Sequence, residues 1–189
     1  MRTPPGQRFD GIRVVPPPGA FLQATAHGQA VLTAAMIEAV GGAGHVADLF
    51  AGCGTFALPL ARGAEVHAVE GEAAMLRALD EGWRKAEGLK KVTTEARDLF
   101  RNPLLPQELE RYDALVLDPP RAGAEAQVRQ IAESKVPVLG FVSCNPVTFA
   151  RDAAVLRAGG YLLDWVQVVD QFRWSSHIEL AARFSRAHI

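Results

Sequence analysis

The strongest constraint in this sequence is an alternation of short, apolar, β-branched runs with amphipathic stretches. Each run is followed by Gly, Asp or Pro and then by a segment of helical character. The runs are residues 45–50 (HVADLF), 65–70 (EVHAVE), 91–96 (KVTTEA), 112–118 (YDALVLD) and 137–143 (PVLGFVS). Strands that alternate with helices run parallel, because each helix is the crossover to the next strand. The pattern therefore predicts an α/β fold with a doubly wound, mostly parallel sheet.

The C-terminal part follows another pattern. Residues 161–169 (YLLDWVQVV) and 177–184 (HIELAARF) leave no room for a helix between them. They are predicted to pair antiparallel at the edge of the sheet. The basic residues near the C-terminus, Arg183, Arg186 and His188, are expected in a solvated tail.

The N-terminal part begins with Pro- and Gly-rich residues 1–20, which are predicted as an extended arm or a truncated linker. Apolar residues at helical spacing predict a helix over residues 27–40, ended by Gly41 and Gly42. Residues 21–189 are expected to form one catalytic domain.

Composition excludes several classes of protein. With 49% hydrophobic residues, 189 residues are enough for one self-sufficient core. A net charge of −1 gives no general attraction to phosphate backbones. No apolar run resembles a signal peptide or a membrane span, so we expect a cytoplasmic protein without membrane contact. Two cysteines, Cys53 and Cys144, are too few for a disulfide framework or a Cys-ligated metal, and no metal is predicted.

Ligands of open α/β sheets bind beyond the carboxyl ends of the strands, so the residues there carry most information. In DLFAGCGTF, Gly52 and Gly54 allow the backbone to approach a ligand closely. Glu70 ends the second strand, where a carboxylate can accept hydrogen bonds from ribose hydroxyls. Asp98 follows the third strand as a candidate partner for an adenine amino group. Together these residues predict an adenosine pocket.

Two kinds of adenosine ligand fit that pocket. GCGTFA also matches the G-x-G-x-x-A loop of dinucleotide enzymes, so an NAD-binding dehydrogenase or a non-catalytic cofactor-binding module remains an alternative. DPPRAG after the fourth strand and SCNP after the fifth favour S-adenosylmethionine, because hydride transfer needs neither segment. Asp118, Pro119 and Pro120 would form a rigid polar ledge beside a methyl donor.

Several segments together resemble one known family. In order and spacing, DLFAGCGTFALPLA, VEG, DPPRAGA, VSCNPVTFARD and HIEL are similar to the catalytic domain of the RNA 5-methyluridine (uracil-5) methyltransferases, over Gly19 to Phe184. The resemblance implies a class I, Rossmann-like methyltransferase fold with a seven-stranded sheet. It also implies that Cys144 is the nucleophile and Glu179 the general base. The residues expected around the methyl donor are Gln23, Phe50, Gly52, Thr55, Glu70, Asp98 and Asp118.

The implied chemistry explains why a cysteine stands at that strand end. A thiolate can add to carbon 6 of uracil, which makes carbon 5 nucleophilic, and Glu179 would later remove the carbon 5 proton. Asn145 is expected to offer polar contacts to the ring edge. The target base must be flipped out of the RNA, and Phe172 or Trp174 would stack on it.

An RNA cytosine-5 methyltransferase is an alternative, because the same addition serves cytosine. Those enzymes tend to place a proline directly before the nucleophile and to use a second cysteine. Here Ser143 precedes Cys144, and Cys53 lies in the glycine loop.

The sequence also departs from the family. Members usually carry an N-terminal RNA-binding domain, and many bind an iron–sulfur cluster through four cysteines. Neither feature is present, so binding of the RNA substrate, rRNA or tRNA, is expected to need a domain absent from this chain, which is otherwise expected to be a monomer. DQFRWSSH replaces the usual Asp-x-Phe-Pro-His-Thr, and Thr55 stands where asparagine is common.

Overall fold

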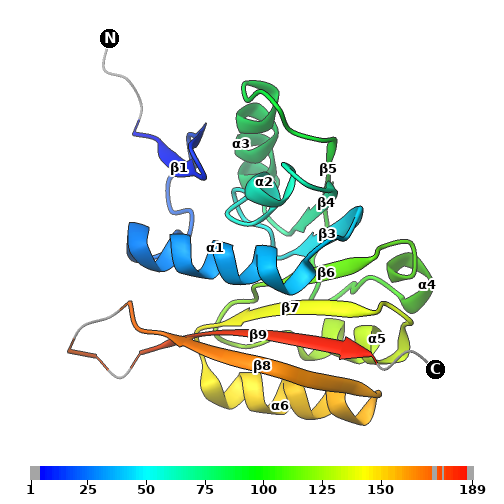
Figure 1. Cartoon of the computed structure of the whole chain (residues 1–189). Helices are drawn as coiled ribbons and strands as arrows, with labels where there is room; N and C mark the ends of the chain where they lie inside the picture. Colours follow the sequence, from blue (N-terminus) through cyan, green and yellow to red (C-terminus); the bar gives the residue numbers. More distant parts are fainter. Residues whose placement is uncertain (1–4, 172–173, 176, 187–189) are drawn as a thin grey trace.

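The computed structural model describes residues 5–171, 174–175 and 177–186. Seven of the described strands form one sheet in the order β5-β4-β3-β6-β7-β9-β8 (Figure 1). They are β3 (His45–Leu49), β4 (Glu65–Glu70), β5 (Val92–Ala96), β6 (Ala114–Leu117), β7 (Val138–Ser143), β8 (Tyr161–Val169) and β9 (Glu179–Arg186). Strands β3 to β7 are parallel, whereas β9 is antiparallel to both β7 and β8. The predicted sheet and its antiparallel C-terminal pair are confirmed.

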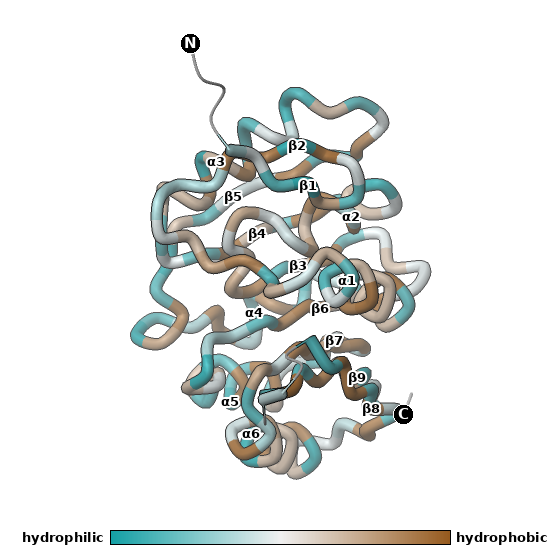
Figure 2. Tube along the Cα trace, turned by 90° about the vertical axis from the view of Figure 1, so that its left-hand side faces the viewer, coloured by the Kyte–Doolittle hydropathy of each residue, from teal (hydrophilic) through white to brown (hydrophobic). Residues whose placement is uncertain are grey.

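Helices cover both faces of the sheet (Figure 1). One face carries α1 (Ala26–Val40), α2 (Ala57–Leu60) and α3 (Ala73–Arg84), and the other carries α4 (Pro106–Leu109), α5 (Glu125–Glu133) and α6 (Pro146–Ala158). The central strand β6 is buried at all four positions, as expected for a parallel strand covered on both sides. Figure 2 shows the hydrophobic residues of β7 and β9 gathered between the helices.

The two longest helices begin at side-chain caps. The Thr25 hydroxyl accepts a hydrogen bond from the amide of Gly28 at 2.9 Å, and α1 follows, which confirms the predicted helix. The Asn145 side chain accepts from the amide of Val147 at 3.0 Å, with Pro146 at the first helical position of α6. Because the cap of α6 comes directly after Cys144, this helix start fixes the end of β7.

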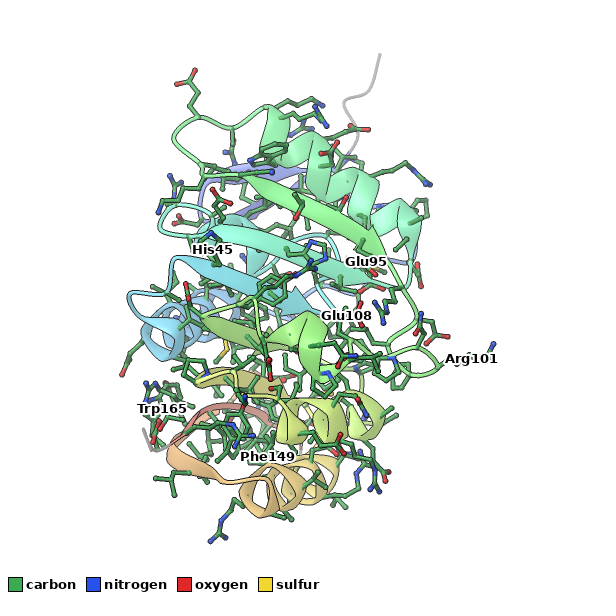
Figure 3. All side chains as sticks on the ribbon, turned by 90° about the vertical axis from the view of Figure 1, so that its right-hand side faces the viewer. His45, Glu95, Arg101, Glu108, Phe149 and Trp165 are labelled. Atoms are coloured by element: carbon green, nitrogen blue, oxygen red, sulfur yellow. The ribbon has the colours of Figure 1, made fainter. Side chains whose placement is uncertain are left out.

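Aromatic rings pack α6 against the sheet. Phe149 of α6, labelled in Figure 3, lies with its ring centroid 5.3 Å from that of Phe141 in β7 and 6.2 Å from that of Phe184 in β9. All three side chains are buried. The helix that follows Cys144 is therefore held against the two strands that carry the predicted catalytic residues.

The N-terminal residues hold a feature that the sequence analysis missed. Instead of a plain extended arm over residues 1–20, β1 (Gln7–Phe9) and β2 (Ile12–Val14) form an antiparallel hairpin. Asp10 and Gly11 make its turn with positive φ angles of 49° and 81°, as a type I′ turn requires. Phe9, Ile12 and Val14 are buried in the core on the α3 side of the sheet. The Asp-Gly signal was present, but the surrounding prolines dominated the prediction.

The basic residues expected in a solvated tail belong instead to β9. The Arg183 guanidinium donates to the carbonyl of Ala39 at 2.9 Å and pairs with Asp164 of β8. The Arg186 guanidinium donates to the carbonyls of Gly159 and Ala132 and lies over the Tyr161 ring. These contacts anchor β9 to its neighbours, so the tail prediction is wrong for both arginines. His188 lies outside the described residues.

Asp48 is a buried carboxylate in the middle of β3. Its side chain is fully buried, and neither oxygen has a hydrogen-bond partner among the described residues. Burial raises the pKa of Asp48 to about 8; the Ala57 amide, although it makes no hydrogen bond of normal geometry to the carboxyl, opposes the rise, and the charge of Glu70 adds to it. The folded state therefore holds this proton more tightly than the unfolded chain does.

Removal of the buried Phe9 ring tests whether the β1–β2 hairpin belongs to the folded core. We expect Phe9→Ala to lower the free energy of unfolding by about 3–5 kcal/mol, because it leaves a cavity at a fully buried site. Urea denaturation followed by circular dichroism measures this. Leu162→Ala, at a site that is 57% exposed, is the control. Equal losses in the two variants would show that the hairpin does not stabilise the domain.

The stability contributed by the protonated Asp48 should depend on pH. It is fully present below the unfolded pKa of about 4 and is lost as the pH rises through the folded pKa of about 8. We expect the free energy of unfolding of the wild type to fall by several kcal/mol across this window, at about 1.4 kcal/mol per pH unit. In Asp48→Asn the fall should be much smaller. Parallel pH profiles for the two proteins would refute the assignment.

Candidate active site

A cavity of about 520 Å³ opens at the carboxyl ends of the parallel strands. It lies where the strand order reverses, since β4 follows β3 on one side and β6 flanks β3 on the other. The residues predicted to be catalytic or to surround the methyl donor all line it: Gln23, Phe50, Gly52, Thr55, Glu70, Asp98, Asp118, Cys144 and Glu179. A second cavity, of about 470 Å³, lies between the hairpin and α3 and is lined by none of them.

The loop after β3 is shaped by unusual backbone angles. Phe50, Gly52 and Gly54 have positive φ angles of 62°, 54° and 93°. A Cβ atom on Gly54 would lie only 2.8 Å from a carbon of Leu79 in α3, so only glycine fits there. Phe50 is a bulky residue in a region that side chains rarely adopt, and such strain is concentrated at ligand sites.

Glu70 ties this loop to the end of β4. One of its carboxylate oxygens accepts a hydrogen bond from the amide of Gly52, and the other accepts from the amide of Glu72, both at 3.0 Å. Each oxygen has a second lone pair, so the carboxylate can also accept from ligand hydroxyls in the cavity. The residue thus both builds the loop and faces the cavity.

Asp98 and two aromatic rings form the opposite part of the cavity. One Asp98 oxygen accepts from the amides of Phe100 and Arg101, at 3.0 and 3.3 Å, which holds the turn after β5. The Phe100 ring lies 5.3 Å from that of Phe50, and both line the cavity. Arg101 projects away from the protein (Figure 3). Phe100 was not identified from the sequence, where nothing distinguishes it from a core residue.

Gln23 is held by a partner that the sequence analysis also missed. The Gln171 amide donates to the side-chain oxygen of Gln23 at 2.9 Å, and the Gln171 oxygen accepts from the amide of Thr25 at 3.4 Å. A Cβ atom on Gly28 would lie 2.2 Å from this oxygen, so a side chain at this position would displace the Gln171 amide from Gln23 and Thr25. An isolated glycine in a helix was the available sign of such a close approach.

Cys144 and Glu179 meet through the pairing of β7 with β9. Ser143 pairs with Leu180 in this antiparallel ladder, so the next residues along, Cys144 and Glu179, are neighbours. Cys144 is half-buried at the end of β7, and Glu179 is buried at the start of β9. Asp118, at the end of β6, lines the same part of the cavity together with Arg121.

The surroundings of Cys144, Glu179 and Asp118 favour the neutral forms of these side chains in the free protein. Burial raises the pKa of Glu179 to about 7, and Arg121 opposes the rise. Burial, and then the charges of Glu179 and Asp48, hold the pKa of Asp118 well above its usual value. Burial also raises the pKa of Cys144, with Glu179 and Asp118 adding to the rise and Arg121 lowering it. Arg121 is thus the cation that favours ionisation of both Cys144 and Glu179.

Asn145 does not present its side chain as expected. Its oxygen caps α6, and its amide nitrogen donates to the carbonyl of Arg121 at 3.0 Å. The residue therefore joins the loop after β6 to the helix after β7, and the expected contact with a substrate ring stays a prediction. Its role at the helix start explains why Asn precedes Pro here.

The remaining predicted residues are placed as follows. Cys53 is buried outside the cavity lining, and burial together with Glu70 and Glu72 raises its pKa to about 11. Trp174 is fully exposed, with a positive φ of 69°, and is not among the residues that line the cavity. Phe172 lies outside the described residues.

The described residues contain neither a metal-binding cluster nor a membrane-spanning helix. No group of three or more His, Cys, Asp and Glu side chains is arranged to hold a metal ion. In the same part of the chain, none of the helices combines the length and the apolar character that crossing a membrane requires.

Several known proteins resemble this chain in sequence. The family model described as tRNA (uracil-5-)-methyltransferase matches residues 82–186, which is more than half of the chain. An uncharacterized RNA methyltransferase of Rhizobium meliloti is 52% identical over 96% of this chain and 44% of its own length. A 23S rRNA (uracil(1939)-C(5))-methyltransferase of Chromohalobacter salexigens is 42% identical over 86% and 34%. The chain thus spans less than half the length of these relatives.

Solved structures agree on the fold. The tRNA (uracil-54, C5)-methyltransferase of Pyrococcus abyssi, in complex with S-adenosyl-L-homocysteine, superimposes with a TM-score of 0.81 at 27% identity, over 95% of this chain and 43% of that one. The TYW2 structure of M. jannaschii, with a TM-score of 0.68 at 18% identity over 96% and 86% of the two chains, shares the fold alone. The class I methyltransferase fold is confirmed, and the chain belongs to the tRNA (uracil-5-)-methyltransferase family.

Proposed function

We propose that this chain is the catalytic part of an S-adenosylmethionine-dependent enzyme that methylates carbon 5 of a uridine in RNA. The observation that carries the proposal is that Cys144 and Glu179 lie next to the last pair of the β7–β9 ladder and line the same cavity as the glycine loop and Glu70. Family membership supports a uracil methyltransferase over the NAD-dependent alternative. The cytosine-5 alternative needs a second cysteine, and Cys53 is buried outside the cavity lining.

The cavity fits the methyl donor. Its volume lies in the range typical of small-molecule sites, roughly 300–1,000 Å³. Glu70 would accept from ribose hydroxyls, the Phe50 and Phe100 rings would contact the planar base, and Gln23 and Asp118 would hold the remaining polar groups. When bound, S-adenosylmethionine supplies an electrophilic methyl group.

The residues of the chain supply the rest of the chemistry. The Cys144 thiolate forms a bond to carbon 6 of the uracil, and the electrons of the 5,6 double bond move to carbon 5 and the carbon 4 carbonyl. Glu179 later takes the proton from carbon 5, the double bond re-forms, and Cys144 leaves as a thiolate. A pKa of about 7 suits a base that works near neutral pH. Arg121 offsets the negative charge that collects on Cys144.

The proposal also covers the RNA substrate, the oligomeric state, the location in the cell and the start of the catalytic domain. The substrate is rRNA or tRNA, as in the printed names of the relatives, and its binding needs an RNA-binding part outside this chain. We propose a monomer that works in the cytoplasm. The catalytic domain includes the β1–β2 hairpin, so it begins before residue 21, because the hairpin packs into the core.

Transfer of a labelled methyl group tests reaction and nucleophile together. The chain is incubated with labelled S-adenosylmethionine and unmodified total RNA, and the RNA is digested to nucleosides. We expect label in 5-methyluridine, lost by several orders of magnitude in Cys144→Ala although the variant still binds S-adenosylmethionine. Cys53→Ala is the matched control and should keep its activity. Label in 5-methylcytidine, or tighter binding of NAD than of S-adenosylmethionine, would contradict the proposal.

The base is tested by Glu179→Gln. Turnover should fall by about 10²–10⁴-fold, because the carbon 5 proton has no acceptor, and the covalent protein–RNA adduct should accumulate on a denaturing gel. In the wild type, kcat should rise as the pH passes about 7, since Glu179 acts only when ionised. This rise should disappear in the variant. Glu133→Gln, at an exposed surface site, is the control. An unaltered pH profile without adduct would exclude Glu179 as the base.

A further inference from the structure

The loop that carries Arg121 rests on one face of α6. The carbonyl of Arg121 accepts hydrogen bonds from the Asn145 amide nitrogen at 3.0 Å and from the Thr148 hydroxyl at 3.3 Å. These residues are three apart and so share a helix face. Both contacts fix the backbone of Arg121 and leave its guanidinium at the cavity wall.

One turn further along α6, an ion pair between the exposed Arg151 and the buried Asp152 holds the same loop. The Arg151 guanidinium donates to the carbonyl of Ala122 at 3.1 Å, and the amide of Ala124 donates to Asp152 at 2.8 Å. The other Asp152 oxygen pairs with Arg151 at 2.8 Å. Asp152 is fully buried, and a buried charge is retained only when it is paired and hydrogen-bonded.

Gly123 shows how closely the loop and the pair fit. Its φ is +77°, and a Cβ atom there would lie 2.5 Å from an Arg151 nitrogen and 2.7 Å from an Asp152 oxygen. Only glycine allows this contact. The helix and the loop are therefore in direct contact at each residue from Arg121 to Ala124.

The same helix begins directly after Cys144, so α6 connects the thiol to the loop that carries its cation. The charged groups that act on Cys144 are Glu179 from β9, Asp118 from the end of β6 and Arg121 from the loop. Of these, only Arg121 favours the thiolate. The contacts with α6 hold the backbone of Arg121, and its guanidinium also lies 3.4 Å from the Nδ1 atom of His177.

We propose that Asp152, together with Arg151, is a positioning residue that holds the loop of residues 118–124 on α6 and thereby keeps the Arg121 guanidinium beside Cys144 and Glu179. The inference rests on the proposed function, because it takes Cys144 as the reacting thiol. Neither Arg151 nor Asp152 lines the cavity, so the pair acts through Arg121.

The test measures the ionisation of Cys144 without RNA or methyl transfer. The rate of alkylation by iodoacetamide is followed from pH 7 to 11 by mass spectrometry of the Cys144 peptide, in the whole chain. We expect the apparent pKa of Cys144 to rise by roughly one pH unit in Asp152→Asn and Asp152→Ala, because a displaced Arg121 no longer favours the thiolate. Arg121→Met should cause a similar rise.

Asp113→Asn is the matched control. Asp113 also joins distant segments, since one oxygen accepts from the amides of Gly44 and His45 at 2.9 and 2.8 Å, but outside the cavity lining. Its Cys144 profile should equal that of the wild type. Should both Asp152 variants fail to fold, Thr148→Val removes one loop contact without removing a charge and should give a smaller rise.

Each of three results would overturn the inference. The first is a rise in Arg121→Met with unchanged profiles in the Asp152 variants, and the second is an unchanged profile in Arg121→Met itself. A rise that is equally large in Asp113→Asn would also overturn it, because general destabilisation would then explain the effect. Loss of methyl transfer to uridine in the wild type would instead refute the proposed function and leave this ionisation readout intact.

Discussion

The reversal of strand order at β3 and β6 is the constraint on which the rest of the structure depends. The two strands lie side by side, and the amide of Asp118 donates to the carbonyl of Leu49 where both end. The connections that leave them diverge, and the space between becomes the cavity. The glycine loop, Glu70 and Asp118 line this space because each follows or ends a parallel strand. The insertion of β9 beside β7 then adds Glu179, which no parallel strand supplies.

Local patterns were sufficient to predict the sheet, because buried parallel strands produce apolar β-branched runs that few other structures share. They were also sufficient for the glycine loop and for the residues at strand ends, whose position in the sequence implies their position in space. The resemblance to the uracil-5 methyltransferases added Gln23 and Glu179. The family and fold are confirmed, and the nine proposed residues line one cavity.

The rest could not be predicted because it depends on distances between segments far apart in the chain. Gln171 reaches Gln23 across 148 positions, and Asp152 reaches Ala124 across 28. Asn145 was expected at the substrate ring, but its two polar groups serve a helix cap and the Arg121 loop. Arg183 and Arg186 looked like parts of a tail, yet they anchor β9. Polar side chains that build a site and those that contact its ligand have the same appearance in a sequence.

The anchoring of β9 has a consequence for the position of Glu179. The register of β9 is held along its length by β7, β8 and the two arginines. A shift by one residue would turn Glu179 to the other face of the sheet. The position of Glu179 at the cavity therefore depends on residues that lie far from the cavity, because Arg183 and Arg186 hold the far half of the strand. The segment before β9 is constrained in another way, since Gln171 holds Gln23 and Thr25 at the start of α1.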